Sequence, residues 1–152
     1  MKLEKYSSLL FLIFVTTACK TQPNGADLSS CKTDYNVKFQ NIAETVDKEM
    51  VADQKLENVV VFFEDYFNDT AKASIKGKNV FQEIINTEES LGTTGKHFSY
   101  NYSNDSEVSD IRIEYKEGCL LIPIKKNYKI IYVYHFDDKW EIIYSNVYPT
   151  YE

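Results

Sequence analysis

The chain has 152 residues, with 17 basic and 23 acidic side chains, and its formal net charge at pH 7 is −6. A net negative surface repels phosphate, and no basic run interleaved with aromatic residues occurs, which argues against nucleic acid as a partner. The length is that of one domain of ordinary size once a targeting segment is removed.

The first residues predict a signal peptide. Lys2 and Lys5 precede a short apolar core at residues 9–15. A helix that crosses a bilayer needs about 20 apolar residues, so this core is too short to span a membrane and has the length of a signal-peptide core.

The end of this segment resembles the signal of bacterial lipoproteins, in which a small residue precedes a cysteine that is acylated, for example with palmitate. Ala18 and Cys19 carry the resemblance, although Thr16 stands where that family usually has Leu. The resemblance implies that residues 1–18 are removed and that Cys19 is lipidated. The protein would then be anchored to a membrane of the cell envelope, on its periplasmic or outer surface. The alternative is an ordinary secretory signal that ends at Ala18.

The predicted organisation is a signal over residues 1–18, a polar tether over 19–33 and a single domain over 34–152. The tether has too few apolar residues to form a packed core. Removal of residues 1–18 leaves 15 basic and 22 acidic side chains, so the mature net charge is −7.

Two cysteines remain in the exported chain if Cys19 is acylated. Cys31 lies where the tether meets the domain, and Cys119 begins a predicted strand. In an oxidising compartment the two pair as a disulfide or remain separate buried thiols, and the sequence leaves both alternatives open.

Helical spacing of apolar residues predicts a first helix over residues 35–51 and a second over 53–68. The run from Val59 to Phe63 alone has strand propensity, but the regular apolar stripe and the charged neighbours favour the helix. Residues 70–77 form either a short strand or a frayed helix end. A third helix is expected at 80–86, after Asn79.

Five strands are predicted in the second half of the chain, and the short loops between them favour antiparallel neighbours. Their expected ranges are 96–102, 109–116, 119–124, 128–136 and 140–148. Pro123 indicates that the third of these strands lies at an edge or contains a bulge.

The last two strands form a predicted hairpin. With a three-residue loop at 137–139, Phe136 faces Trp140, and Tyr134 and Ile142 share the same aromatic face. This register places Trp140 in the core.

The order of elements resembles the cone-shaped α+β fold of the nuclear transport factor and ketosteroid isomerase superfamily. The residues that carry the resemblance lie at 62–67, at 75–85 and at 137–142. The resemblance implies helices packed on one curved antiparallel sheet of about four to six strands, and this α+β architecture is the expected fold class. The carboxylate base and oxyanion donors of ketosteroid isomerase do not map onto this chain, so no catalytic residue is transferred.

The candidate ligand-facing residues are Tyr132, Tyr134 and Tyr144, because tyrosines on a concave sheet suit a sugar, a peptide or an apolar ligand. The β propensity of tyrosine alone explains the same pattern, which makes a purely structural role the competing interpretation.

An enzyme would also need a titratable group buried beside those rings, and the hairpin supplies none on that face. Glu64, Asp65 and Glu114 are the nearest candidates, although helical carboxylates are usually solvated. Burial of one of them in a tyrosine-lined cavity would favour an enzyme over binding without catalysis.

Other polar clusters have simpler interpretations. His135 lies beside Asp137 at the hairpin tip, where solvent exposure is expected. Asp105, Glu107 and Asp110 lack the order of a calcium loop and suit an exposed turn. Neither a metal nor a cofactor is expected.

The leading functional prediction is a lipid-anchored envelope protein whose domain binds a partner protein or a small ligand without catalysis. One alternative is a small isomerase or dehydratase on the cone-shaped fold. Another is an inhibitor or immunity protein of the envelope.

Overall fold

The computed structural model describes residues 31, 35–105, 109–137 and 139–150, which form nine strands and one short 3₁₀ helix, η2 (Lys48–Met50). The strands are β1 (Asn36–Phe39), β2 (Asn58–Phe63), β3 (Asn68–Ile75), β4 (Lys78–Asn86), β5 (Lys96–Asn101), β6 (Asp110–Tyr115), β7 (Gly118–Pro123), β8 (Ile130–Phe136) and β9 (Lys139–Ser145). None of these residues lies in a helix that is long and apolar enough to cross a membrane.

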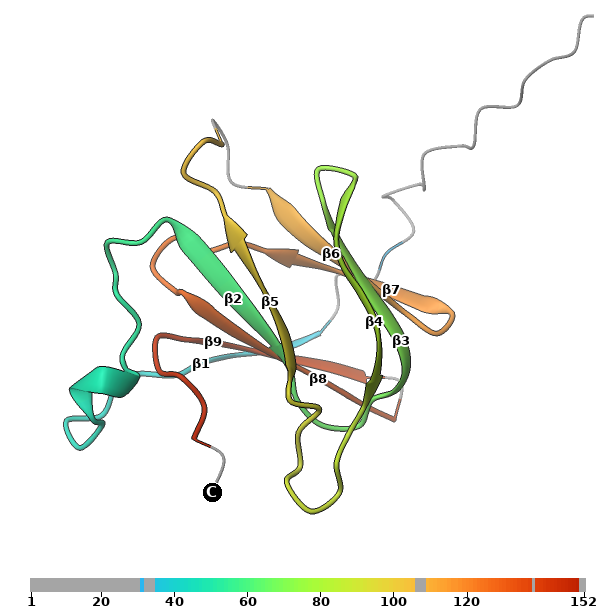
Figure 1. Ribbon diagram of the computed structural model, residues 1–152, viewed down its shortest axis with the longest axis horizontal. Coiled ribbons are helices and arrows are strands. Elements are labelled where there is room, and N and C mark those ends of the chain that lie inside the picture. The colour runs from blue at the N-terminus through green and yellow to red at the C-terminus, as the bar shows by residue number, and fades with distance from the viewer. Residues whose placement is uncertain (1–30, 32–34, 106–108, 138, 151–152) are drawn as a thin grey trace, which may run out of the picture.

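The strands form two sheets that pack face to face (Figure 1). One sheet has five strands in the order β1-β9-β8-β2-β5, and the other has four in the order β4-β3-β6-β7. The five-stranded sheet is mixed, because β1 runs parallel to β9 and β2 runs parallel to β8. All neighbours in the four-stranded sheet are antiparallel.

A single apolar core fills the space between the sheets. Val59, Val61 and Phe63 on β2 point into it, and the Phe63 ring centroid lies 4.9 Å from that of Phe81 on β4. On β9 the inward residues include Trp140, which is 4% exposed. The burial expected for Trp140 is therefore confirmed.

The prediction of an α+β fold with helices on one sheet is wrong, because the described residues form a two-sheet β structure without an α-helix. Residues 58–63 of the predicted second helix form β2, and residues 80–86 of the predicted third helix lie in β4. Since β2 lies between β8 and β5 and is buried on both faces, it is an unbroken apolar run without alternation. Such a run matches helical spacing as well as strand spacing. The cone-shaped α+β fold that the resemblance implied is wrong as well, because it requires those helices.

The apolar stripe predicted to bury the first helix includes side chains that are exposed. Phe39 is 50% exposed and Ile42 is 47% exposed, and the chain here forms β1, a loop and η2. Residues 70–77, where a short strand or a helix end was expected, belong mostly to β3.

The five strands predicted in the second half are confirmed as β5 to β9, within a few residues at each end. The prediction that they are all neighbours in one sheet is wrong, because β6 and β7 lie in the four-stranded sheet and β5, β8 and β9 in the other. β7 is an edge strand of the four-stranded sheet, which explains how Pro123 is accommodated without losing a ladder hydrogen bond.

The register predicted for the last hairpin is wrong by one residue. Phe136 pairs with Lys139 and His135 pairs with Trp140, so two residues separate the strands. Asp137 adopts a φ of 48°, which aspartate tolerates and which two-residue hairpin turns require. The shift separates the predicted aromatic face into two: Trp140 faces the core, whereas Tyr134 faces the opposite side of the sheet.

Cys31 and Cys119 are joined by a disulfide bond, one of the two alternatives that the sequence left open. The bond attaches the chain just before β1 to the edge strand β7. Cys19 and the signal segment lie outside the described residues.

Candidate functional site

The outer face of the five-stranded sheet carries a second apolar cluster. Side chains alternate along each strand, so Val60 and Phe62 of β2 lie on this face beside Ile130 and Tyr132 of β8. Glu64 follows β2 with the same parity, and its backbone N–H donates to the carbonyl of Val133 at 2.9 Å. Glu64 therefore lies next to Tyr134 on the outer face.

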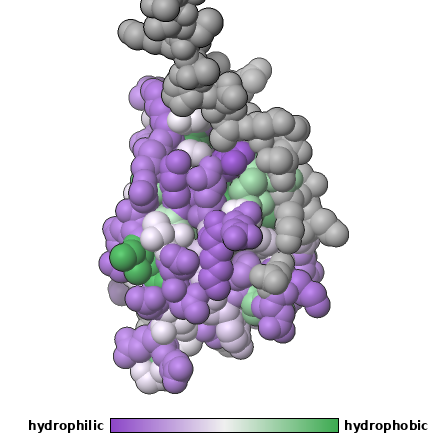
Figure 2. Space-filling model, turned by 90° about the vertical axis from the view of Figure 1, so that its right-hand side faces the viewer, coloured by the Kyte–Doolittle hydropathy of each residue, from purple (hydrophilic) through white to green (hydrophobic). Residues whose placement is uncertain are grey.

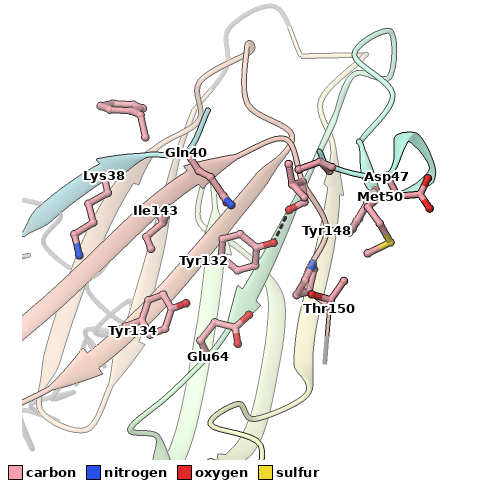
Figure 3. A pocket seen from close by; sticks show the side chains of 14 residues that line it. Lys38, Gln40, Asp47, Met50, Glu64, Tyr132, Tyr134, Ile143, Tyr148 and Thr150 are labelled. Atoms are coloured by element: carbon pink, nitrogen blue, oxygen red, sulfur yellow. Dashed lines mark hydrogen bonds between the residues drawn. The ribbon is translucent and has the colours of Figure 1, made fainter. Parts of the chain in front are cut away.

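A cleft of about 770 Å³ lies on this face (Figure 3). Its floor comes from β1, β8, β9 and the residue after β2, and its walls come from the segment around η2 and from the chain after β9. The lining residues are Lys38, Phe39, Gln40, Val46, Asp47, Met50, Glu64, Tyr132, Tyr134, Ile143, Val147, Tyr148, Pro149 and Thr150.

The two wall segments are held together by backbone hydrogen bonds. The N–H of Tyr148 donates to the carbonyl of Met50 at 2.8 Å, and that of Ala52 donates to the carbonyl of Asn146 at 2.8 Å. The hydroxyl of Tyr132 donates to the carbonyl of Val147 at 2.5 Å and so ties the wall to the sheet. These bonds fix the positions of the two wall segments, which are far apart in sequence.

Glu64 is the buried carboxylate of the cleft, with only 4% of its surface exposed. Tyr132, Tyr134 and Glu64 project from the same side of the sheet in Figure 3. A carboxylate buried beside tyrosine rings is the arrangement that the sequence analysis set as the condition favouring an enzyme. The expectation that Glu64 lies on a solvated helix face is wrong.

The charge of Lys38 is balanced outside the cleft. Its Nζ lies 2.8 Å from a carboxylate oxygen of Glu141, which also accepts a hydrogen bond from Nδ2 of Asn36 at 2.8 Å. The described lining also carries the carboxylates of Glu64 and Asp47. Apart from Lys38, the described charged side chains of the lining are therefore acidic.

Of the three candidate ligand-facing tyrosines, Tyr132 and Tyr134 line the cleft and Tyr144 does not. Tyr144 is buried between the sheets, and its hydroxyl donates to the carbonyl of Pro123 at 2.7 Å. Burial raises the pKa of the Tyr144 hydroxyl, with a smaller contribution from Tyr35 and Asp110.

The other candidate bases lie elsewhere. Glu114 is on β6 of the opposite sheet, where the guanidinium of Arg112 donates a hydrogen bond that lowers the pKa of the carboxyl group. Asp65 accepts from the N–H of Tyr66 at 2.7 Å. His135, near the hairpin tip, is half-buried and packs against Trp140, with ring centroids 4.6 Å apart.

The acidic turn after β5 contributes no metal site among the residues with described positions, which contain no cluster of three metal-ligating side chains. Asp105 accepts from the Tyr100 hydroxyl at 2.7 Å and pairs with Lys76 at 2.9 Å. Glu107 lies outside the described part of the chain.

Comparison with protein-family models, curated proteins and solved structures finds no match to this chain. The function must therefore be argued from the geometry of the cleft.

Most of the cleft could not be found from sequence. Asp47, Met50 and Thr150 show no pattern that marks a site, because they reach it through loops. Glu64 had a usable signal, since it continues the parity of Val60 and Phe62 once residues 58–63 are recognised as a strand.

Proposed function

We propose that this chain is a lipid-anchored protein of the bacterial cell envelope whose outer sheet face binds a small cationic ligand. Ala18-Cys19 supports the anchor, with Cys19 as the acylated residue. The observation that carries the binding proposal is the buried carboxylate of Glu64 beside Tyr132 and Tyr134 in the cleft.

The chemistry of the cleft suits an ammonium or guanidinium group attached to an apolar body. Carboxylates form strong charge-assisted hydrogen bonds with such groups, and tyrosine rings attract them through their π faces. Apolar side chains such as Ile143 and Met50 suit the remainder of the ligand. An aromatic or aliphatic amine is thus the expected class.

Calorimetric titration of the mature protein with phenethylamine and with phenylacetate tests the proposal, because the two share a ring and differ in charge. We expect the amine to bind and the acid not to bind. Glu64→Gln should weaken the amine by about 10- to 100-fold, the value of one charge-assisted hydrogen bond. Glu83→Gln is the matched control, since Glu83 lies on β4 and pairs with Lys96.

Equal binding of the acid and the amine would refute the proposal, as would equal effects of Glu64→Gln and Glu83→Gln. Binding of lysine-rich peptides with no binding of free amines would replace the small ligand with a partner protein. The inhibitor or immunity alternative stays a prediction from the sequence.

The second candidate function is proton transfer by Glu64, whose burial beside tyrosines meets the condition stated above for an enzyme. Binding is placed first because it requires only the buried carboxylate and the rings, whereas catalysis also requires a carbonyl substrate held against them. Proton abstraction next to a carbonyl is the reaction class that suits one buried carboxylate as the base and tyrosine hydroxyls beside it. Deuterium incorporation into cyclic ketones in D₂O, followed by NMR, is the test. Exchange catalysed by the wild type and lost in Glu64→Gln would establish the enzyme, and absence of exchange would remove it.

A further inference from the structure

The outer face of the four-stranded sheet holds a groove that is separate from the cleft. Figure 2 shows the side of the molecule on which β3, β4, β6 and β7 lie, and its described surface is mostly hydrophilic. The groove has a volume of about 750 Å³. Its lining residues are Lys72, Ser74, Lys76, Gly77, Asn79, Ser109, Asp110, Arg112, Glu114 and Leu121.

Arg112 is the central side chain of this groove. It lies on β6 opposite Ser74 of β3 and opposite Leu121 of β7, and its side chain is 13% exposed. Its Nε donates to Glu114 at 2.8 Å. Its Nη1 is buried and has no hydrogen-bond partner in the part of the chain that the structure describes.

A buried guanidinium nitrogen without an acceptor is rare, because the loss of water around a donor is costly unless a new acceptor replaces it. Glu114 accepts from Nε of Arg112 and pairs with Lys72 at 3.5 Å, but it makes no hydrogen bond with Nη1. The Ser74 hydroxyl and the Asn79 amide add neutral donors to the same groove. The groove is therefore rich in donors around the unpaired Nη1 of Arg112.

The charge balance favours a ligand of low charge. The described lining contains three cationic side chains, Lys72, Lys76 and Arg112, and two carboxylates, Asp110 and Glu114. Lys76 pairs with Asp105 outside the lining at 2.9 Å, so the two remaining cations are matched by the two carboxylates. A monoanion therefore adds one uncompensated charge to the groove, whereas a dianion adds two.

We infer that this groove is a binding site for a singly charged oxyanion, with Arg112 as the principal ligand-binding residue and Lys72 and Ser74 beside it. A carboxylate and a phosphodiester share this chemistry, and both match the hydrogen-bonding geometry of a guanidinium group. The inference is independent of the cationic ligand proposed for the cleft.

NMR titration of the mature protein in detergent tests the inference with acetate, dimethyl phosphate and sulfate at constant ionic strength. We expect saturable shifts of the Ser74 and Arg112 amide signals with a monoanion and weaker binding of sulfate. The tighter of acetate and dimethyl phosphate identifies the source as a carboxylate or a phosphodiester.

Arg112→Gln should weaken the monoanion by at least about tenfold, because it removes the charge and keeps a planar donor. Lys96→Gln, on β5 of the other sheet and outside the lining of both the cleft and the groove, is the matched control and should leave binding unchanged. Lys72→Gln keeps the Arg112–Glu114 bond and serves as the second variant if Arg112→Gln unfolds; it should also weaken binding.

Three results would overturn the inference. The first is absence of saturation with both monoanions, which would mean that water alone satisfies Arg112. The second is equal binding by wild type, Arg112→Gln and Lys72→Gln, which would indicate an adventitious ion only. The third is tighter binding of sulfate than of either monoanion, which would indicate non-specific attraction.

Discussion

Replacing Trp140 with alanine tests the packing between the two sheets. Trp140 is on β9, and its ring centroid lies 4.6 Å from that of His135, 6.2 Å from Tyr115 on the opposite sheet and 6.3 Å from Phe67. Truncation of a core tryptophan costs about 3–5 kcal/mol, depending on how far the surroundings collapse. Strands on both sides limit that collapse, so we expect a loss of about 4 kcal/mol in the free energy of unfolding.

Urea denaturation followed by far-UV circular dichroism is the assay, because Trp140 is the only tryptophan and its fluorescence disappears with it. With a slope of about 2 kcal/mol per molar urea, the midpoint should fall by about 2 M. Phe136→Ala is the matched control in the same hairpin, since Phe136 is 36% exposed, and it should cost under about 1 kcal/mol. A Trp140→Ala loss no larger than that of the control would refute the packing argument.

Three further predictions concern the anchor, the disulfide and a buried tyrosine. Intact mass should show an acylated chain that begins at Cys19, and Cys19→Ser should leave the membrane fraction; an unmodified mass or retention of the variant would contradict this. Cys31→Ser opens a bond between residues 88 apart, which the chain-entropy model values at about 4–5 kcal/mol in chemical denaturation, and equal stability of reduced and oxidised protein would contradict it. Burial raises the pKa of Tyr144, so its contribution to stability is complete below the unfolded value of about 10 and is lost as pH rises through the folded value. Tyr144→Phe should therefore flatten the alkaline loss of stability, whereas parallel pH profiles of the two proteins would refute the assignment.

Local patterns predicted strands β5 to β9 correctly because the residues that mark each strand and its turns lie close together in the sequence. Between β6 and β7 the break is marked by Glu117-Gly118, and between β7 and β8 by a polar stretch at 125–127. Turn residues and β-branched or aromatic runs favour a conformation over a few positions, so this preference does not depend on the tertiary arrangement.

The prediction from local patterns was wrong for β2, which is buried on both faces of its sheet. Val59 to Phe63 is apolar throughout because β5 and β8 flank β2 and both of its faces are covered. Periodicity carries no strand signal in such a segment. The hairpin register failed for a different reason, since it depended on whether Asp137 accepts a left-handed conformation.

By itself, the sequence determined the acidic character of the chain and the five strands between residues 96 and 145, because these depend on composition and on neighbours along the chain. The tertiary structure alone decided that β2 lies beside β8, and it thereby brought Glu64 next to Tyr134. It also decided that the chain around η2 and the chain after β9 cover the same sheet face and make a cleft there. Contacts between residues about 70 to 100 positions apart depend on pairing partners that no local pattern encodes, so the site became visible only when the strands were in place.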